Sequence, residues 1–273
     1  MKKIYIFFVL LFVSTSLSAT IPSEQVLQEF LSDLNKPLAL TINGGNFTSS
    51  SYLPGIPHFL VESGISGIQF NMRNPEGEGK IKTAISMFNI KANFGIFRGF
   101  SLMPNWKGFL GLEAGIKGSE FPLLGNLLKY KKKYPFIFSL STKCNFIKSY
   151  HFIPNISFSF EYSQLFDEEF QFIDESKHET ASCSFNHHSL YYHIDMREKF
   201  ALVDFYAGIG WISSALQSDY TIVENTGSFT SENISINKFY FGITIPVELI
   251  DVSLEFGRSG SYGFYGAAFG FKM

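Results

Sequence analysis

The sequence lacks the features that mark several common protein classes. Only two of its 273 residues are cysteine. Cys144 falls in one predicted strand and Cys183 directly before another, so we expect free thiols rather than a disulfide or a metal site. After residue 19 no apolar run approaches the roughly 18 residues of a membrane-spanning helix, which excludes a helical membrane protein. The net charge of −2 provides no basic surface for nucleic acid.

The first residues form a targeting signal. Met1-Lys2-Lys3 is basic, Ile4–Val13 is apolar, and Ser14–Ala19 is rich in small residues. This order is typical of a secretory signal peptide, which we assign to residues 1–19. Since the residue directly after the expected cleavage site is not a cysteine, we expect no lipoprotein anchor.

Apolar residues are nevertheless abundant: 45% of the chain is hydrophobic and 32 residues are Phe. They alternate with polar or small residues, as in the last stretch, Tyr265–Met273. A period of two indicates a strand whose two faces meet different environments. Many such strands behind a secretory signal predict an all-β fold, an antiparallel transmembrane β-barrel of the outer membrane of a Gram-negative-type bacterium.

We predict ten strands, with connections that are alternately long and short. Outer-membrane barrels have short periplasmic turns and longer outer loops, and an even number of strands leaves both chain ends in the periplasm. The predicted barrel covers residues 57–273, with strands at 57–72, 89–103, 108–118, 134–147, 153–164, 184–195, 200–213, 236–246, 248–257 and 263–273.

Charged residues share the polar parity of these strands and should face the lumen. They either line a permeation path or form a paired network that fills it. Two places depart from this alternation. Arg98 falls on the same face as apolar residues, which suggests a bulge near Gly99. The first strand exchanges its apolar face near Gly64. The candidate lumen residues are Lys91, Glu113, Lys117, Lys143, Glu161, His193, Asp204, Asp251 and Glu255.

Residues 20–56 do not resemble barrel strands. Apolar residues at helical spacing predict an amphipathic helix over Glu24–Leu34, capped by Ser23 and stopped by Pro37. We interpret 20–56 as a periplasmic helix with a plug or lead-in segment. Its packing residues would be Phe30, Leu34, Gly44 and Gly45, and for the two glycines a loop turn is equally compatible.

The best candidate for chemistry is His187 with Ser189, because outer-membrane lipid hydrolases use a His-x-Ser pair. Such a pair must face lipid. Here the residues expected to face lipid are instead Leu190, Tyr192 and Ile194, on the opposite face of the strand. We therefore predict that His187 and Ser189 face inward, that the protein is not an enzyme, and that it has no catalytic residue, metal or cofactor.

Five segments follow one another in a recognisable order. They are the N-terminal helix with Asn43-Gly44-Gly45, Tyr52 to Gly64, Phe97 to Pro104, Gly111 to Lys117 with Phe121 to Leu128, and Tyr206 to Trp211. In this order they resemble a family of uncharacterised bacterial outer-membrane barrels, distantly like the long-chain fatty-acid transporter type. That resemblance implies a barrel with an N-terminal helical element and no established substrate. Such barrels usually end in an aromatic residue that the barrel-assembly machinery reads, whereas this chain ends in Met273.

Two functions stay open at this point. The barrel allows passive passage of a small or hydrophobic solute, which the sequence does not identify, or it is a non-transporting structural or adhesive barrel. A membrane lipid hydrolase is a third, weaker alternative. The expected partners are outer-membrane lipid and the assembly machinery, with no nucleic acid.

Overall fold

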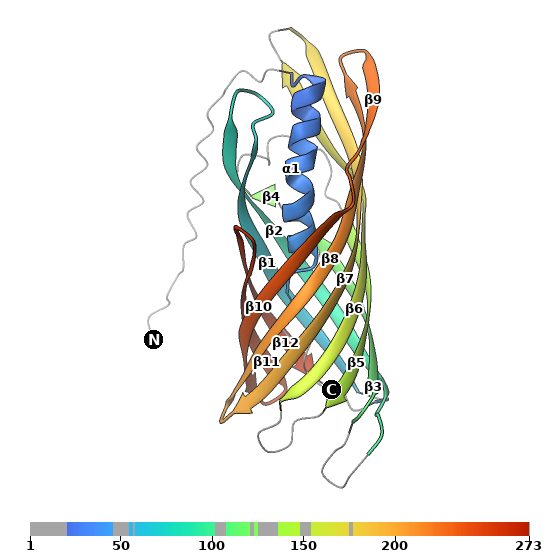
Figure 1. The fold of residues 1–273 in the computed structure, drawn as a ribbon, viewed down its shortest axis with the longest axis vertical. Coiled ribbons are helices and arrows are strands. Elements are labelled where there is room, and N and C mark those ends of the chain that lie inside the picture. Colours follow the sequence, from blue (N-terminus) through green and yellow to red (C-terminus); the bar gives the residue numbers. More distant parts are fainter. Residues whose placement is uncertain are drawn as a thin grey trace, which may run out of the picture.

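The computed structural model describes residues 21–45, 55–56, 58–101, 108–120, 123–124, 136–147, 154–174 and 177–272. Its sheet closes on itself, because β1 pairs antiparallel with both β2 and β12. Within these residues the result is a closed antiparallel barrel of ten long strands around one helix, α1 (Figure 1).

The number of long strands agrees with the sequence prediction. They are β1 (Phe59–Arg73), β2 (Lys80–Phe97), β3 (Gly111–Glu120), β5 (Phe136–Ile147), β6 (Asn155–Asp174), β7 (Glu179–Phe200), β8 (Val203–Ile222), β10 (Ile234–Val247), β11 (Ile250–Ser259) and β12 (Tyr262–Lys272). Two short strands, β4 (Leu123–Leu124) and β9 (Asn225–Thr230), extend the sheet beside β2 and β8.

Several strands run on where long loops were predicted. The expected loops 73–88, 165–183 and 214–235 are mostly strand, and β6, β7 and β8 have 20, 22 and 20 residues. A membrane crossing needs only about 9–11. These strands are therefore about twice as long as a crossing requires, and their upper parts project from the barrel as hairpins. We call this projection the upper rim: residues 68–73, 80–87, 168–174, 179–186, 215–222 and 225–230.

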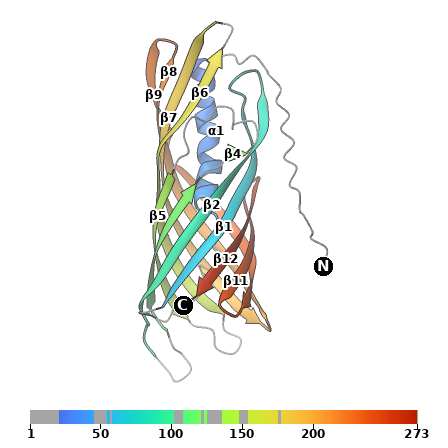
Figure 2. The same cartoon turned by 180° about the vertical axis from the view of Figure 1, so that it is seen from behind.

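Helix α1 (Glu24–Ile42) is longer than predicted. Its N-cap is Ser23, as expected, but Pro37 lies inside the helix instead of stopping it. The helix stands between the β6–β9 wall and the β1–β2 hairpin and ends about halfway down the barrel (Figures 1 and 2). Its apolar side chains from Leu27 onward are buried there, so tertiary packing sustains the helix beyond Pro37.

The helix also begins at a different end of the barrel from the one assigned by sequence. Near its start, Glu24 accepts a hydrogen bond from Tyr220, at the upper end of β8. The barrel sequence itself begins and ends at the opposite end, where Leu60 pairs with Lys272. The helix is therefore not a cover over that lower end, which sequence analysis assigned to the periplasm.

The two irregular places have physical explanations. The pairing of β2 with β3 shifts between Gly95 and Phe97, slightly before the bulge expected near Gly99, and Arg98 lies beyond the end of β2. Strand β1 pairs with β2 without a shift from Phe59 to Arg73. The exchange of its apolar face near Gly64 is therefore a change of surroundings along one unbroken strand.

Candidate functional site in the lumen

The lumen contains two different environments, and the carboxyl end of α1 lies at the boundary between them. Around the first half of the helix the inner wall is mainly apolar, and Phe30 packs edge-on against Phe170 and Phe172 with ring centroids 5.8 and 6.1 Å apart. Leu34 is also fully buried. Below the end of the helix the inner wall is polar and charged.

Two lysines of the barrel wall meet the carboxyl end of α1. Lys117 of β3 donates a hydrogen bond to the carbonyl oxygen of Ile42 at 2.8 Å, and Lys238 of β10 donates to that of Asn43 at 2.7 Å. The last carbonyls of a helix are unsatisfied and carry partial negative charge. The last turn of α1 contains no basic residue of its own, so the wall supplies the cations.

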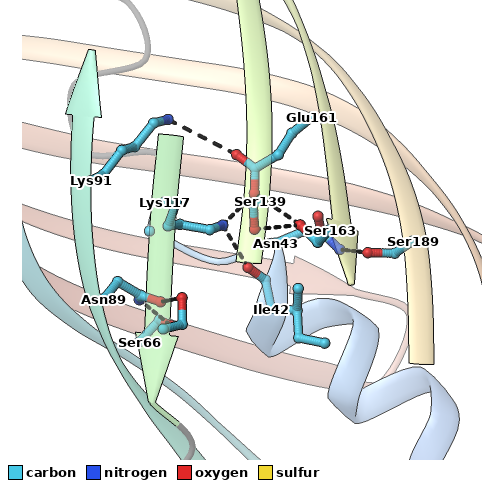
Figure 3. A network of polar contacts seen from close by, with 12 residues as sticks. Ile42, Asn43, Ser66, Asn89, Lys91, Lys117, Ser139, Glu161, Ser163 and Ser189 are labelled. Carbon is cyan, nitrogen blue, oxygen red and sulfur yellow. Dashed lines mark hydrogen bonds and ion pairs between the residues drawn. The ribbon is translucent and has the colours of Figure 1, made fainter. Parts of the chain in front are cut away.

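Each of these lysines also has a carboxylate partner. Lys117 pairs with Glu161 of β6, which lies 3.9 Å from Lys91 as well. Lys238 lies 3.8 Å from Glu255, and the same Glu255 oxygen accepts from the backbone N–H of Gly45 at 3.3 Å. Buried charges need such pairing, because desolvation is costly. We call this group, Lys91, Lys117, Glu161, Lys238 and Glu255, the lysine clasp; Figure 3 shows its Lys91–Lys117–Glu161 half.

The residues after the helix fit tightly into the clasp. Asn43 donates to Ser189 at 2.9 Å (Figure 3). A Cβ on Gly44 would lie 3.1 Å from the Cβ of Ser66, so the close approach to β1 requires a small residue. Gly45 has a φ of 76°, the left-handed conformation that commonly ends a helix.

The other predicted lumen residues also face inward and form pairs. Glu113 lies 3.0 Å from Lys143, and His193 lies 3.3 Å from Asp195. Asp204 pairs with Arg197, and Asp251 with Lys272. The structure thus places all nine predicted residues on the inner face and gives them partners; a permeation path stays a prediction.

The cavity beside the clasp is small. It has a volume of about 20 Å³ and is lined by residues that include Lys91, Glu113, Lys143 and His193. A single water needs roughly 10–15 Å³ by the same measure, so this space holds about one water.

Sequence reasoning missed several inward charges, and the clearest are Lys238, Arg197 and Glu62. Lys238 has the parity of Ile236 and Tyr240, opposite Phe239 and Phe241, and this alternation alone identifies it as inward. Arg197 was assigned to a connection that is in fact strand β7. Glu62 was not assigned to the inner face, because the apolar face of the first strand is exchanged near Gly64.

The candidate catalytic pair faces inward, as predicted. His187 and Ser189 are fully buried, and Ser189 is bonded to Asn43 of the helix end. Among the described residues no group of three metal-binding side chains occurs. Cys144 and Cys183 are both free thiols, as expected from the sequence.

Comparison with known proteins gives matches to structures only. No family model and no curated protein matches the chain. The translocator domain of autotransporter NalP from Neisseria meningitidis has a TM-score of 0.47 and 10% identity, over 79% of this chain and 87% of that one.

Two proteins of Escherichia coli give similar values. The transport unit of autotransporter AIDA-I has a TM-score of 0.42 and 10% identity over 88% of this chain and 98% of that one. The outer membrane protease OmpT has a TM-score of 0.41 and 9% identity, over 82% of this chain and 100% of that one. The solved structures that this chain resembles are thus outer-membrane β-barrels, and a likeness to the fatty-acid transporter type is not shown.

Proposed function

We propose that the protein is a closed barrel of the bacterial outer membrane that acts through the surface of its upper rim and not as a solute path through its lumen. The observation that carries this proposal is the burial of α1. Seven large apolar side chains of the helix are completely inaccessible: Leu27, Phe30, Leu31, Leu34, Leu38, Leu40 and Ile42.

Moving the helix out of the barrel would be expensive. Each of these side chains would lose about 1.5–3 kcal/mol of burial free energy. The clasp adds two buried lysines that bond the helix end. Passive passage requires a path that opens at a free-energy cost close to thermal energy. The burial free energy of this helix is much larger than that.

The outer face of the upper rim supports a role in recognition. It is polar and carries a groove of about 600 Å³, whose lining includes Glu169, Ser184, Asp219 and Ser228. Residues of this kind suit contact with water and polar partners. The proposal includes no catalytic activity, because His187 and Ser189 lie beneath the helix end.

The membrane placement is supported by the outer surface of the lower barrel. Exposed apolar side chains ring it, including Phe158, Ile194, Ile209 and Phe241. Exposing such a surface to water is unfavourable, whereas lipid accepts it. The first and last strands of the barrel begin and end at its lower end. With that end in the periplasm, the upper rim faces the outside of the cell.

Conductance across a planar bilayer tests closure. We expect the full-length protein to give no steady current, and a variant lacking residues 20–56 to conduct. Leu34→Asp, which places a charge in the helix core, should give intermittent openings if the deletion variant does not insert. Steady conductance of the unaltered protein would favour the solute-passage alternative.

Labelling of intact cells tests orientation separately. Ser228 on β9 is exposed, and Ser228→Cys in a Cys144→Ser background gives one accessible thiol. A membrane-impermeant maleimide should label it from outside. Labelling only after permeabilisation would reverse the orientation.

A further inference from the structure

The outer wall has two apolar grooves of nearly equal size at the top of the lipid-facing band. One lies over β7, β8, β10 and β11 and has a volume of about 590 Å³. The other lies over β2, β3 and β5 and has about 560 Å³. Both volumes lie within the range of small-molecule pockets, about 300–1,000 Å³.

The walls of the two grooves are alike. The first is lined by Ile194, Ile209, Phe239, Phe241 and Phe256, around the small Ala207. The second is lined by aromatic and branched residues around the small residues Ala92 and Gly118. In each, small residues between bulky ones leave an open furrow on the membrane side.

The grooves differ in the charge at their upper end. Arg258, opposite Phe239 across β10 and β11, is exposed at the end of the first groove. Glu120, between Phe88 and Phe136, is exposed at the end of the second. The Nε of Arg258 donates to the carbonyl oxygen of Gly260 at 2.7 Å, which uses one of its five N–H donors and orients the guanidinium.

The level of Arg258 matches a lipid headgroup. On β10 the outward residues change from Phe241 and Phe239 to the polar Asn237, and Arg258 lies in the row of Phe239. A guanidinium at this level faces the headgroup layer, while the groove below faces acyl chains. Arginine binds phosphate with a planar, bidentate geometry.

We propose that the Arg258 groove is a binding site for a membrane lipid whose phosphate-bearing headgroup has a net negative charge, with an acyl chain in the groove and the phosphate on Arg258. The Glu120 groove has a similar volume and a similar apolar lining but the opposite charge, so it does not select this lipid. The inference rests on the membrane placement under the proposed function, but not on whether the lumen is closed.

A tryptophan beside the groove provides a direct readout. The chain has two tryptophans, Trp106 and Trp211. Trp211 faces outward on β8, two residues above Ile209, or roughly 7 Å along the strand. A Trp106→Phe background leaves Trp211 as the single fluorophore, and a brominated lipid bound in the groove will quench it.

The experiment compares two brominated lipids in reconstituted bilayers. At equal mole fraction, brominated phosphatidylglycerol should quench Trp211 with about fivefold higher apparent affinity than brominated phosphatidylcholine, the ratio expected for one basic residue at an anionic headgroup. Arg258→Gln should abolish this preference, and the matched control Glu120→Gln should retain it. Equal quenching by both lipids in the parent, or a preference that survives Arg258→Gln, would overturn the proposal.

A second variant separates the apolar part of the site from its charge. Ala207→Leu fills the groove but keeps Arg258, and it should weaken quenching by the anionic lipid. An unchanged preference in this variant would show that the groove itself does not hold the lipid. Heat-modifiable gel migration verifies that each variant is folded. Conductance of the same samples reports on the closed lumen independently, so one proposal can fail without the other.

Discussion

The lower barrel and the upper rim are continuous along the same strands, but their polarity is opposite. On β7 of the lower barrel, Ile194 faces out and His193 faces in, whereas in the rim Ser184 faces out and Phe185 faces in. The lower part is arranged for lipid outside and a polar lumen, and the upper part for water outside and an apolar core. One strand can serve both, because its period of two holds while the environments on its two faces are exchanged.

The helix is the reason for this exchange. An apolar lumen would be unfavourable if it held water, and α1 excludes water from it by packing its own apolar side chains there. The rim is thus a small globular core built on top of the lower barrel. The lysine clasp lies where the two environments meet and bonds the exposed carbonyls of the helix end.

The largest effect is expected from truncation in the rim core. Phe30→Ala should lower the free energy of unfolding by about 3–5 kcal/mol, since it leaves a cavity between α1 and β6. Urea titration in lipid vesicles, followed by gel migration, measures this change. Phe239→Ala on the lipid face is the control, because Phe239 is 60% exposed and lines no closed core. Equal losses would mean that the rim has no core of its own.

Insertion of charge distinguishes the outer faces of the two regions. Phe158→Arg, on the lipid face of β6, should cost about 2–4 kcal/mol if it lies near the midplane. Gln171→Arg, on the outer face of the same strand in the rim, should change stability by less than about 0.5 kcal/mol, as surface substitutions do. The same titration gives both values. If Gln171→Arg were as costly as Phe158→Arg, the rim would be embedded in lipid.

The sequence predicted the barrel, the ten strands and nine of the inward charged or titratable residues, because alternation in the lower barrel is strict. It failed where the alternation inverted. Near Gly64 the apolar residues move from one face of the strand, with Val61 and Ile65, to the other, with Ile68 and Phe70. Periodicity alone records which residues share a face. It does not say whether that face meets lipid, water or a helix.

The position of the helix was beyond the reach of the sequence for a related reason. The apolar stripe of α1 shows that it must be buried, but it does not say whether the helix lies against the periplasmic end of the barrel or inside the lumen. The contacts that decide between them, such as Lys117 with Ile42 and Lys238 with Asn43, join residues that are 75 and 195 positions apart. No local pattern encodes pairs at such separations.

A smaller effect is expected at the boundary between the regions. Lys238→Met keeps the apolar stem but removes the hydrogen bond to Asn43, and it should cost about 1.5–3 kcal/mol, as for a hydrogen bond to a charged group. Lys272→Met is the control, because that lysine lies at the barrel end with its side chain 37% exposed. It should cost at most about 1 kcal/mol. A similar small loss in both would show that the clasp does not hold the helix.

The smallest effect is expected at the free end of the helix, where the rim meets solvent. The hydroxyl of Ser23 accepts a hydrogen bond from the backbone N–H of Val26 at 3.4 Å, and Ser23 itself is exposed. Ser23→Ala should therefore cost about 1 kcal/mol, the usual value of an N-cap. Ser32→Ala, at an exposed mid-helix position, should be neutral or slightly stabilising, because alanine has the higher helix propensity. If the rim unfolds before the lower barrel, Ser23→Ala will speed hydrogen exchange of α1 amides and leave those of β10 to β12 unchanged. Faster exchange in both regions would mean that the rim and the barrel unfold as one unit.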